Sequence, residues 1–363
     1  MEDARPEALF TAGHGNSNTG MANHSCADLT CYMVLSNSEQ TVIGTICFIA
    51  GPLTFLENLL VFCLILFTPA LRRRPSYLFI SSMALADICA SIFFTFSFLD
   101  FHLFKRKDNP AIYLFKLGGV TLAFTSSVGS LLLTALDRYI CISRPSEYKT
   151  ILTRRRALWC LLVLWLLTTV IAFLPLMGWR CMNLMELCSQ LFPYVDHRYL
   201  ACWTVFAMAL LALIVYAYIH ILWKAHKHTV YMARHSIRPG QARMRMDIRL
   251  AKMFGLILAI LVTCWVPVLS FMLVDVFTLL NVDQQRAFAF CSTLCLVNSS
   301  VNPLIYALRS RDIREVMLGL LPCCHRTGVF MESSQESEGQ NKMPHQDTVS
   351  ERVEKQQMDI DGM

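Results

Sequence analysis

Charged residues are scarce in this sequence. Asp, Glu, Lys and Arg make up 16% of its 363 residues, against about 25% in ordinary soluble proteins. Hydrophobic residues account for 55% of the chain. This composition excludes a soluble protein of ordinary make-up and indicates one that crosses a membrane several times.

Charge is absent altogether from five long apolar stretches. A helix needs roughly 20 apolar residues to cross a bilayer core of about 30 Å. Stretches of this length without Asp, Glu, Lys or Arg are residues 117–136, 157–178, 200–219, 253–274 and 287–308. Two more stretches carry one acid each, Glu57 within 40–71 and Asp87 within 76–99. The sequence therefore predicts an all-α membrane protein, a seven-transmembrane helix bundle.

A cleavable secretory signal is also missing. The first residues are polar and rich in Gly and Asn, and they contain no apolar core of the kind that such signals have. We expect the first transmembrane span to act as its own insertion signal.

The distribution of basic residues predicts the orientation, because short cytoplasmic loops favour Lys and Arg. Basic residues concentrate in the loops after the first, third and fifth spans, at Arg72, Arg73, Arg74, Arg144, Lys149, Arg154, Arg155, Arg156, Lys224, Lys227, Arg234, Arg238, Arg243, Arg245, Arg249 and Lys252. The cluster Lys105, Arg106 and Lys107 after the second span is a small exception. We expect a multi-pass protein of the cell membrane with its N-terminus outside, which agrees with the glycosylation sequon at Asn23.

The net charge of +6 follows from this topology, because cytoplasmic Lys and Arg lie beside anionic membrane lipid. Nothing in the sequence suggests that it binds nucleic acid. Most of the 15 cysteines lie within the spans. Cys181 and Cys188 bracket a short segment of the second outer loop, where a local disulfide could form, and Cys26 and Cys31 are a weaker pair.

Four regions are expected along the chain. They are an extracellular tail at 1–39, the bundle at 40–310, a short amphipathic eighth helix with a palmitoylation site at 311–324, and a disordered cytoplasmic tail at 325–363. Cys323 and Cys324 are the palmitoylation candidates, with two unmodified thiols as the alternative. The tail offers Ser333, Ser334 and Ser337 as phosphorylation sites.

Motifs recur in order, one for each span. They are Asn58, Leu85-Ala86-Asp87, Asp137-Arg138-Tyr139, Trp165, Tyr216, Cys264-Trp265-Val266-Pro267 and Asn302-Pro303 with Tyr306. With these motifs, the chain from about residue 40 to 324 resembles the rhodopsin-like (class A) G-protein-coupled receptors.

The resemblance implies two buried polar sites. A mid-membrane carboxylate is costly unless it is paired, and by resemblance the residues around it form a sodium pocket: Asn58, Asp87, Ser127, Asn298 and Asn302. A hydrogen-bonded cluster without an ion is the alternative. No cofactor is expected apart from this sodium ion.

The second implied site is an activation switch. Arg138 could pair with Asp137 and, across the bundle, with Asp247, and this latch would break when a G protein binds. Pro267 removes a backbone donor and kinks its helix, while Trp265 points toward the presumed cavity floor. The switch set is Asp137, Arg138, Tyr139, Tyr216, Asp247, Trp265, Pro267, Asn302, Pro303 and Tyr306.

Several residues that related receptors use are absent. Val120 replaces the aspartate of amine receptors, and Leu296 replaces the Schiff-base lysine of opsins. Tyr113 stands where most class A receptors have a cysteine that ties the second outer loop to span three. Leu210 stands in place of the usual proline of span five.

The outer half of the bundle is instead aromatic and apolar. Phe94, Phe98 and Phe101 recur at helical spacing, and plain helix packing is the alternative explanation of such a stripe. We expect a site for a long lipid with a small polar head, formed by Phe94, Phe98, Phe101, His102, Lys116, Val120, Thr121, Phe124, Phe192, Tyr199, Trp203, Trp265, Phe288 and Ser292. Lys116 could contact the lipid head or extend to the membrane interface.

These departures are similar to those of the cannabinoid receptors, and close resemblance extends through segments such as 74–80, 126–130, 222–226, 245–252 and 289–292. The short N-terminal tail favours type 2, whereas residues 114–120 and the spacing of Cys181 and Cys188 are more like type 1.

Membership of this family implies binding of endocannabinoid lipids such as arachidonoylglycerol and anandamide, coupling to a heterotrimeric Gi/o protein and inhibition of adenylyl cyclase. Arrestin and receptor kinases would bind the C-terminal tail. A receptor for another lipid mediator is one alternative.

A transporter should show internal repeats and broken helices, and no repeat is evident. An enzyme is not expected, because His220, His226 and His228 lack acidic partners for a metal site and no other metal-binding motif is present.

Overall fold

The structure is a computed structural model that describes residues 29–182, 188–235 and 241–320. Side chains are described in these ranges except at 30–31, 225–226, 228–235, 241–254, 306–309, 311 and 320. Several predictions lie outside this part of the chain, including the modification sites at Asn23, Cys323 and Cys324, the tail serines, and the pairing of Cys26 with Cys31. Asp247 and Tyr306 lie in described helices, but their side chains are not among those described.

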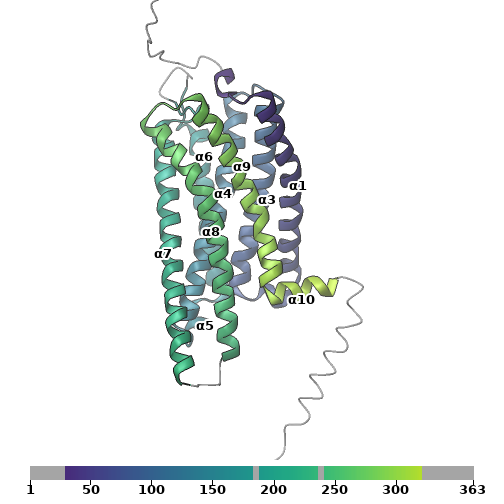
Figure 1. The fold of residues 1–363 in the computed structure, drawn as a ribbon, viewed down its shortest axis with the longest axis vertical. Coiled ribbons are helices and arrows are strands. Elements are labelled where there is room, and N and C mark those ends of the chain that lie inside the picture. Colours follow the sequence, from purple (N-terminus) through teal and green to yellow (C-terminus); the bar gives the residue numbers. More distant parts are fainter. Residues whose placement is uncertain (1–28, 183–187, 236–240, 321–363) are drawn as a thin grey trace, which may run out of the picture.

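Within the described residues, seven helices are long and apolar enough to cross a membrane (Figure 1). They are α1 (Asn37–Phe67), α3 (Pro75–Phe98), α4 (Pro110–Ser143), α6 (Arg154–Met177), α7 (His197–His235), α8 (Gln241–Phe277) and α9 (Val282–Arg309). The prediction of an all-α, seven-transmembrane bundle is confirmed.

Shorter elements connect and flank these helices. They are the 3₁₀ turn η1 (Leu29–Tyr32), α2 (Pro69–Arg72), the π-helical turn η2 (Leu99–Leu103) that continues α3, α5 (Tyr148–Ile151) and α10 (Arg311–Leu320). Figure 1 shows α10 lying across the end of the bundle beside α9. Helix α10 begins directly after α9 ends, at the position where the amphipathic eighth helix was expected.

Local capping explains where several helices begin. Ser36 and Glu39 form a capping box at the start of α1, in which the Ser36 amide donates to Glu39 Oε2 at 2.7 Å. Asn109 accepts a hydrogen bond from the Ile112 amide at 2.8 Å, and Pro110 follows as the first residue of α4. These caps satisfy donors that the helix itself leaves without partners.

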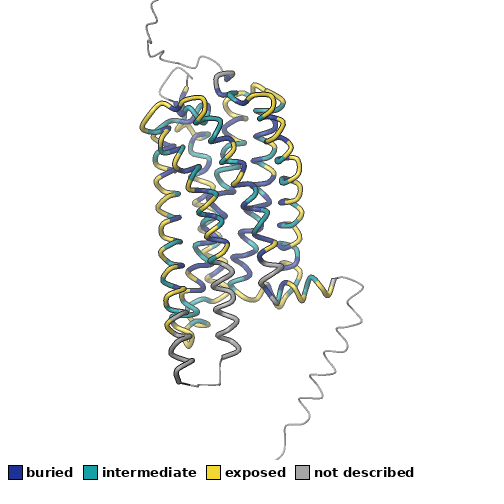
Figure 2. Tube along the Cα trace, viewed as in Figure 1, coloured by how far each residue is buried: buried dark blue, intermediate teal, exposed yellow. Residues whose placement is uncertain are grey.

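Helix α4 is central, because it packs against α3, α6, α7 and α8. Two adjacent glycines make its close contacts possible: a Cβ on Gly118 would lie 2.6 Å from the Phe173 ring of α6, and a Cβ on Gly119 would overlap the Phe93 ring of α3. Figure 2 shows burial concentrated on the inner faces of the helices. The outer faces expose large apolar side chains such as Phe48 and Leu166 to the lipid.

The second outer loop contains two isolated antiparallel bridges, Arg180 with Val195 and Cys188 with Asp196, and no strand is present in the part of the chain described. A disulfide joins Cys181 to Cys188, which confirms the predicted pair. The loop therefore carries its own crosslink above the bundle.

Candidate functional site

A cavity of about 170 Å³ lies in the outer half of the bundle, among α3, α4, α7, α8, α9 and the second outer loop. The structure brings together around it every predicted ligand-binding residue except Lys116. Those residues are Phe94, Phe98, Phe101, His102, Val120, Thr121, Phe124, Phe192, Tyr199, Trp203, Trp265, Phe288 and Ser292. The aromatic stripe on span two therefore faces a cavity and does more than pack helices together.

Aromatic contacts run from the wall of the cavity to its floor. Phe94 meets Phe124 edge to face, with ring centroids 6.3 Å apart. Phe124 in turn meets Trp265 edge to face at 4.9 Å. Such contacts have defined geometries, so the Phe124 ring packs directly on the Trp265 ring of α8.

The cavity is uncharged: its lining residues, all within the described chain, include no Asp, Glu, Lys or Arg. Two of its aliphatic hydroxyl groups already donate to backbone carbonyls. Thr121 Oγ1 donates to the Leu117 carbonyl at 2.9 Å, and Ser292 Oγ donates to the Ala289 carbonyl at 2.9 Å. Each hydroxyl oxygen can still accept a hydrogen bond, which suits a neutral ligand with a small hydroxylated head.

Lys116 is the exception among the predicted ligand-binding residues. Its ammonium group donates to Asp108 Oδ2 at 2.6 Å and to Asp100, and it lies over the Phe96 ring. Lys116 is not among the residues that line the cavity. The π-helical turn after α3 buries Asp100, and this buried carboxylate draws the lysine toward the first outer loop because an unpaired buried charge is costly.

The roof of the cavity contains residues that the sequence prediction missed. Tyr32 and Val34, from the segment before α1, line the cavity together with Gln190 of the second outer loop. The Tyr32 hydroxyl donates to the Ser189 carbonyl at 3.1 Å. The capping box at Ser36 was the signal in the sequence, because it locates the start of α1 and so places the residues before it at the outer end of the bundle.

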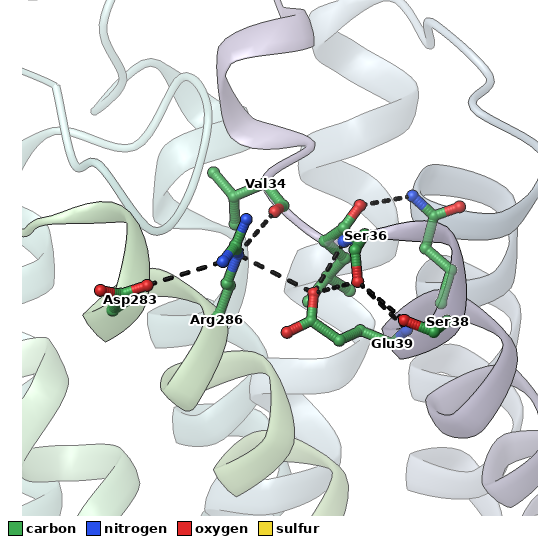
Figure 3. A network of polar contacts seen from close by, with 8 residues as sticks. Val34, Ser36, Ser38, Glu39, Asp283 and Arg286 are labelled. Atoms are coloured by element: carbon green, nitrogen blue, oxygen red, sulfur yellow. Dashed lines mark hydrogen bonds and ion pairs between the residues drawn. The ribbon is translucent and has the colours of Figure 1, made fainter.

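An arginine of α9 holds this segment in place, as Figure 3 shows. Arg286 Nε donates to the Val34 carbonyl at 3.1 Å, and the guanidinium group lies 3.8 Å from Glu39 and 3.6 Å from Asp283. The N-terminal segment is therefore fastened to the helix that supplies Phe288 and Ser292.

Asp87 lies at the centre of the bundle and is fully buried. Its carboxylate accepts hydrogen bonds from Ser127 at 3.2 Å, Ser299 at 2.9 Å and Asn302 at 2.8 Å. Ser299 was missed, because it belongs to none of the motifs that predicted this cluster.

Among the described residues, no hydrogen bond joins Asp87 to Asn58 or Asn298, the other predicted members of this cluster. Asn58 Nδ2 donates to the Thr54 and Ser299 carbonyls, and the amide oxygen of Asn298 is buried with no hydrogen-bond partner among the described atoms. Carboxylate, hydroxyl and amide oxygens are the ligands that hard cations prefer, so this set of side chains fits a small cation.

At the cytoplasmic end, Arg138 is paired with its neighbour. Arg138 Nε donates to Asp137 Oδ2 at 2.8 Å, and both side chains are buried. Ser76 Oγ donates to the same oxygen at 2.8 Å, while the Tyr148 hydroxyl donates to Asp137 Oδ1 at 2.7 Å. Burial and the adjacent Asp137 carboxylate raise the pKa of Tyr148, which keeps this donor protonated.

The tyrosine of α7 that faces the interior of the bundle is not the one that was predicted as a switch residue. Tyr216 is 68% exposed on the outer face, whereas Tyr218 is buried and lies close enough to Arg138 and Asp137 to interact electrostatically. Residues two positions apart on an α-helix, such as Tyr216 and Tyr218, point in directions about 200° apart. The choice of Tyr216 as a switch residue is wrong by this register, and Tyr218 occupies the inward position. Tyr139 lies at the surface and packs against His220, with ring centroids 5.5 Å apart.

Comparison with known proteins agrees with this geometry. The family model "7 transmembrane receptor (rhodopsin family)" matches residues 57–306. Cannabinoid receptor 1 of Xenopus laevis is 48% identical over 332 residues, which cover 87% of this chain and 70% of the relative. Cannabinoid receptor 2 of Homo sapiens is 51% identical over 310 residues, which cover 85% of each chain.

These relatives are receptors and not enzymes, and both subtypes match at similar identity. The seven helices, the uncharged aromatic cavity and the matches across most of the chain agree. The chain therefore belongs to the cannabinoid receptors, multi-pass cell-membrane proteins within the rhodopsin family of G-protein-coupled receptors.

Proposed function

We propose that this receptor binds endocannabinoid lipids of the arachidonoyl class, such as arachidonoylglycerol and anandamide. The observation that carries the proposal is the aromatic cavity with no charged side chain among its described lining residues. Transfer of a neutral acyl chain from water to such a site is favourable, whereas a cationic amine would find no counter-ion there. The names of the relatives point to the same chemical class.

The proposed switch is the aromatic pair on the cavity floor. A lipid that contacts Phe124 and Trp265 differently in two packings of α8 shifts the balance between them. A shift from about 1% to 99% active needs roughly 5.5 kcal/mol of preference between the two states. Pro267, two residues beyond Trp265 in α8, weakens the helix at the point where such a movement would pivot.

The proposed partner is a Gi/o protein, whose activation inhibits adenylyl cyclase. In this scheme Arg138 leaves Asp137, and any contact with Asp247, when the cytoplasmic end of α8 moves outward. Tyr218 beside Arg138 is suited to stabilise the released guanidinium group. Arrestin and receptor kinases are proposed to act on the tail after residue 324.

A sodium ion is a further proposal. Asp87 would hold it through a carboxylate oxygen, with Ser127, Ser299 and the free amide oxygen of Asn298 as the other candidate ligands. The ion would supply the positive charge that the buried carboxylate lacks, and it would favour the inactive packing.

A displacement assay tests the ligand class. Membranes that contain this chain should bind a radiolabelled cannabinoid that anandamide and arachidonoylglycerol displace, and the same lipids should accelerate nucleotide exchange on Gi. Displacement only by another class of lipid mediator would point to the alternative receptor. Lipid flux in liposomes without nucleotide exchange would point to a transporter.

A further inference from the structure

Ser189, in the second outer loop, is fully buried, and its polar atoms make five hydrogen bonds. Its amide donates to the Val195 carbonyl at 2.9 Å, and its carbonyl accepts from Tyr32. Its hydroxyl donates to Asp275 Oδ2 at 2.5 Å and accepts from the amides of Leu191 at 3.1 Å and Phe192 at 3.0 Å. One side chain therefore sets the path of the loop above the cavity.

Asp275 lies on α8 and is 2% exposed. Besides Ser189, its carboxylate accepts a hydrogen bond from the Gln190 amide at 3.0 Å. The Gln190 side chain then accepts from the Leu280 amide at 2.7 Å, just beyond the end of α8. A buried carboxylate is tolerated only when it is hydrogen-bonded, so these contacts hold the loop firmly to the outer end of the sixth transmembrane helix.

The same loop segment forms the ceiling of the cavity. Gln190, Leu191 and Phe192 all line it, and Phe192 packs edge to face on Phe288 with ring centroids 5.5 Å apart. Helix α8 supplies Trp265 and Met272 to the same cavity. A ligand inside the cavity therefore touches α8 directly at Trp265 and indirectly through Phe192, Ser189 and Asp275.

We propose that Asp275 and Ser189 are positioning residues, a clamp through which the ligand-bound ceiling holds the outer end of α8. Ten residues separate Trp265 from Asp275, which corresponds to about 15 Å along a helix, and Pro267 lies between them. The clamp thus acts on the opposite side of the proline from the cytoplasmic end. It keeps the ligand under the ceiling and couples ceiling movement to the helix that signals. This inference rests on the proposed function, because it assumes that the cavity takes the activating lipid.

The test compares Asp275→Asn, Ser189→Ala and the double variant with the unchanged receptor. Ser270→Ala is the control, because Ser270 is an exposed hydroxyl on the same helix that bonds only to its own backbone, at Val266. The readouts are the dissociation rate of a radiolabelled cannabinoid and agonist-stimulated nucleotide exchange on Gi. A hydrogen bond to a buried charged group is strong enough that each single variant should speed dissociation by about tenfold. It should also lower the maximal agonist response.

The double variant should be no worse than the worse single variant, because residues that act as one unit are not additive. Effects that add fully, or single variants that match the control, would overturn the proposal. Amide hydrogen exchange in the ligand-free receptor provides a readout that does not depend on the ligand. The Leu191 and Phe192 amides should exchange faster in Asp275→Asn, while those of α3 should not change.

The two proposals fail in different ways. If the unchanged receptor binds no cannabinoid, the proposed function fails while the exchange data still report whether the clamp exists. If the receptor binds cannabinoids normally and Asp275→Asn leaves both dissociation and amide exchange unchanged, the clamp alone is refuted.

Discussion

Individual buried charges in this receptor are accompanied by partners. Asp87, Asp100, Asp137 and Asp275 are each at most 5% exposed, and each carboxylate accepts hydrogen bonds or ion pairs from described neighbours. An isolated charge in a medium of low dielectric would be very costly. The partners therefore determine what each charged side chain is free to do, and two of these charges lead to direct tests.

Replacing Lys116 by Met should weaken folding more than ligand binding. The change leaves Asp100 buried without its main partner, so the free energy of unfolding should fall by roughly 1–3 kcal/mol. The dissociation constant for a cannabinoid should stay within about twofold. Thermal unfolding and saturation binding measure the two quantities. Lys105→Met, at an exposed position of the first outer loop, is the control, and a large loss of affinity at unchanged stability would return Lys116 to the ligand site.

Replacing Asp87 by Asn should abolish the effect of sodium on the receptor. In the unchanged protein, added NaCl should lower agonist affinity, because the cation proposed at Asp87 would favour the inactive packing. The amide of Asn carries no charge to attract the ion. Agonist competition curves in NaCl and in N-methylglucamine chloride provide the measurement, and an equal sodium response in the variant would refute the site.

At the scale of single elements, α8 combines a bulky ring, a proline and an anchored outer end. Replacing Trp265 by Leu removes the edge-to-face contact with Phe124. Basal nucleotide exchange on the G protein should then rise, or the agonist response should fall. Trp159→Leu is a matched control, because Trp159 is 57% exposed on α6 and faces lipid. Exchange that is unchanged with and without agonist would argue against Trp265 as the switch.

The contact between α3 and α4 depends on the absence of a side chain. Gly119→Ala places a methyl group against the Phe93 ring, and overpacking of this kind typically costs about 1–3 kcal/mol. Gly255→Ala is the control, because no atom beyond its own stretch of helix lies within 4 Å of its Cβ position. There the better helix propensity of Ala should add up to about 1 kcal/mol. Thermal unfolding in detergent measures the stability of the two variants. Equal stability would mean that the contact between α3 and α4 accommodates a methyl group at position 119 without cost.

Patterns within one helix were predictable, whereas contacts between distant segments were not. The spans and the stripe of Phe94, Phe98 and Phe101 follow from composition and helical periodicity. The inward position of Tyr218 in place of Tyr216 required the rotation of α7 about its axis, which motif spacing did not provide. The pairing of Lys116 with Asp100 depends on the π-helical turn after α3, and no sequence pattern in that segment predicted the turn.

At the scale of the whole molecule, the cavity is closed by segments from three parts of the chain. The residues before α1, the second outer loop and α9 meet above it, joined by Tyr32, Ser189 and Arg286. Sequence reasoning could identify the walls, because they lie on regular helices. The roof depends on contacts between loops and termini, whose conformations are not periodic.

Replacing Arg286 by Ala should loosen this roof. The Val34 carbonyl loses its donor and Glu39 loses a nearby cation, so ligand should dissociate about twofold to tenfold faster, given that the arginine is partly exposed. Arg198→Ala, at an exposed position on the same outer surface, serves as the control. Dissociation measured after addition of excess unlabelled ligand provides the rate, and identical rates in both variants would show that the N-terminal segment does not retain the ligand.

The placement of the disulfide has a consequence for the way the receptor moves. The bond between Cys181 and Cys188 closes within the second outer loop, and Tyr113 offers no sulfur at the top of α4. The loop is therefore not crosslinked to the third transmembrane helix, but hydrogen bonds to Asp275 join it to the sixth, α8. If α8 moves during activation, as proposed, the second outer loop can move with it. The cavity would then change shape at its ceiling and at its floor together.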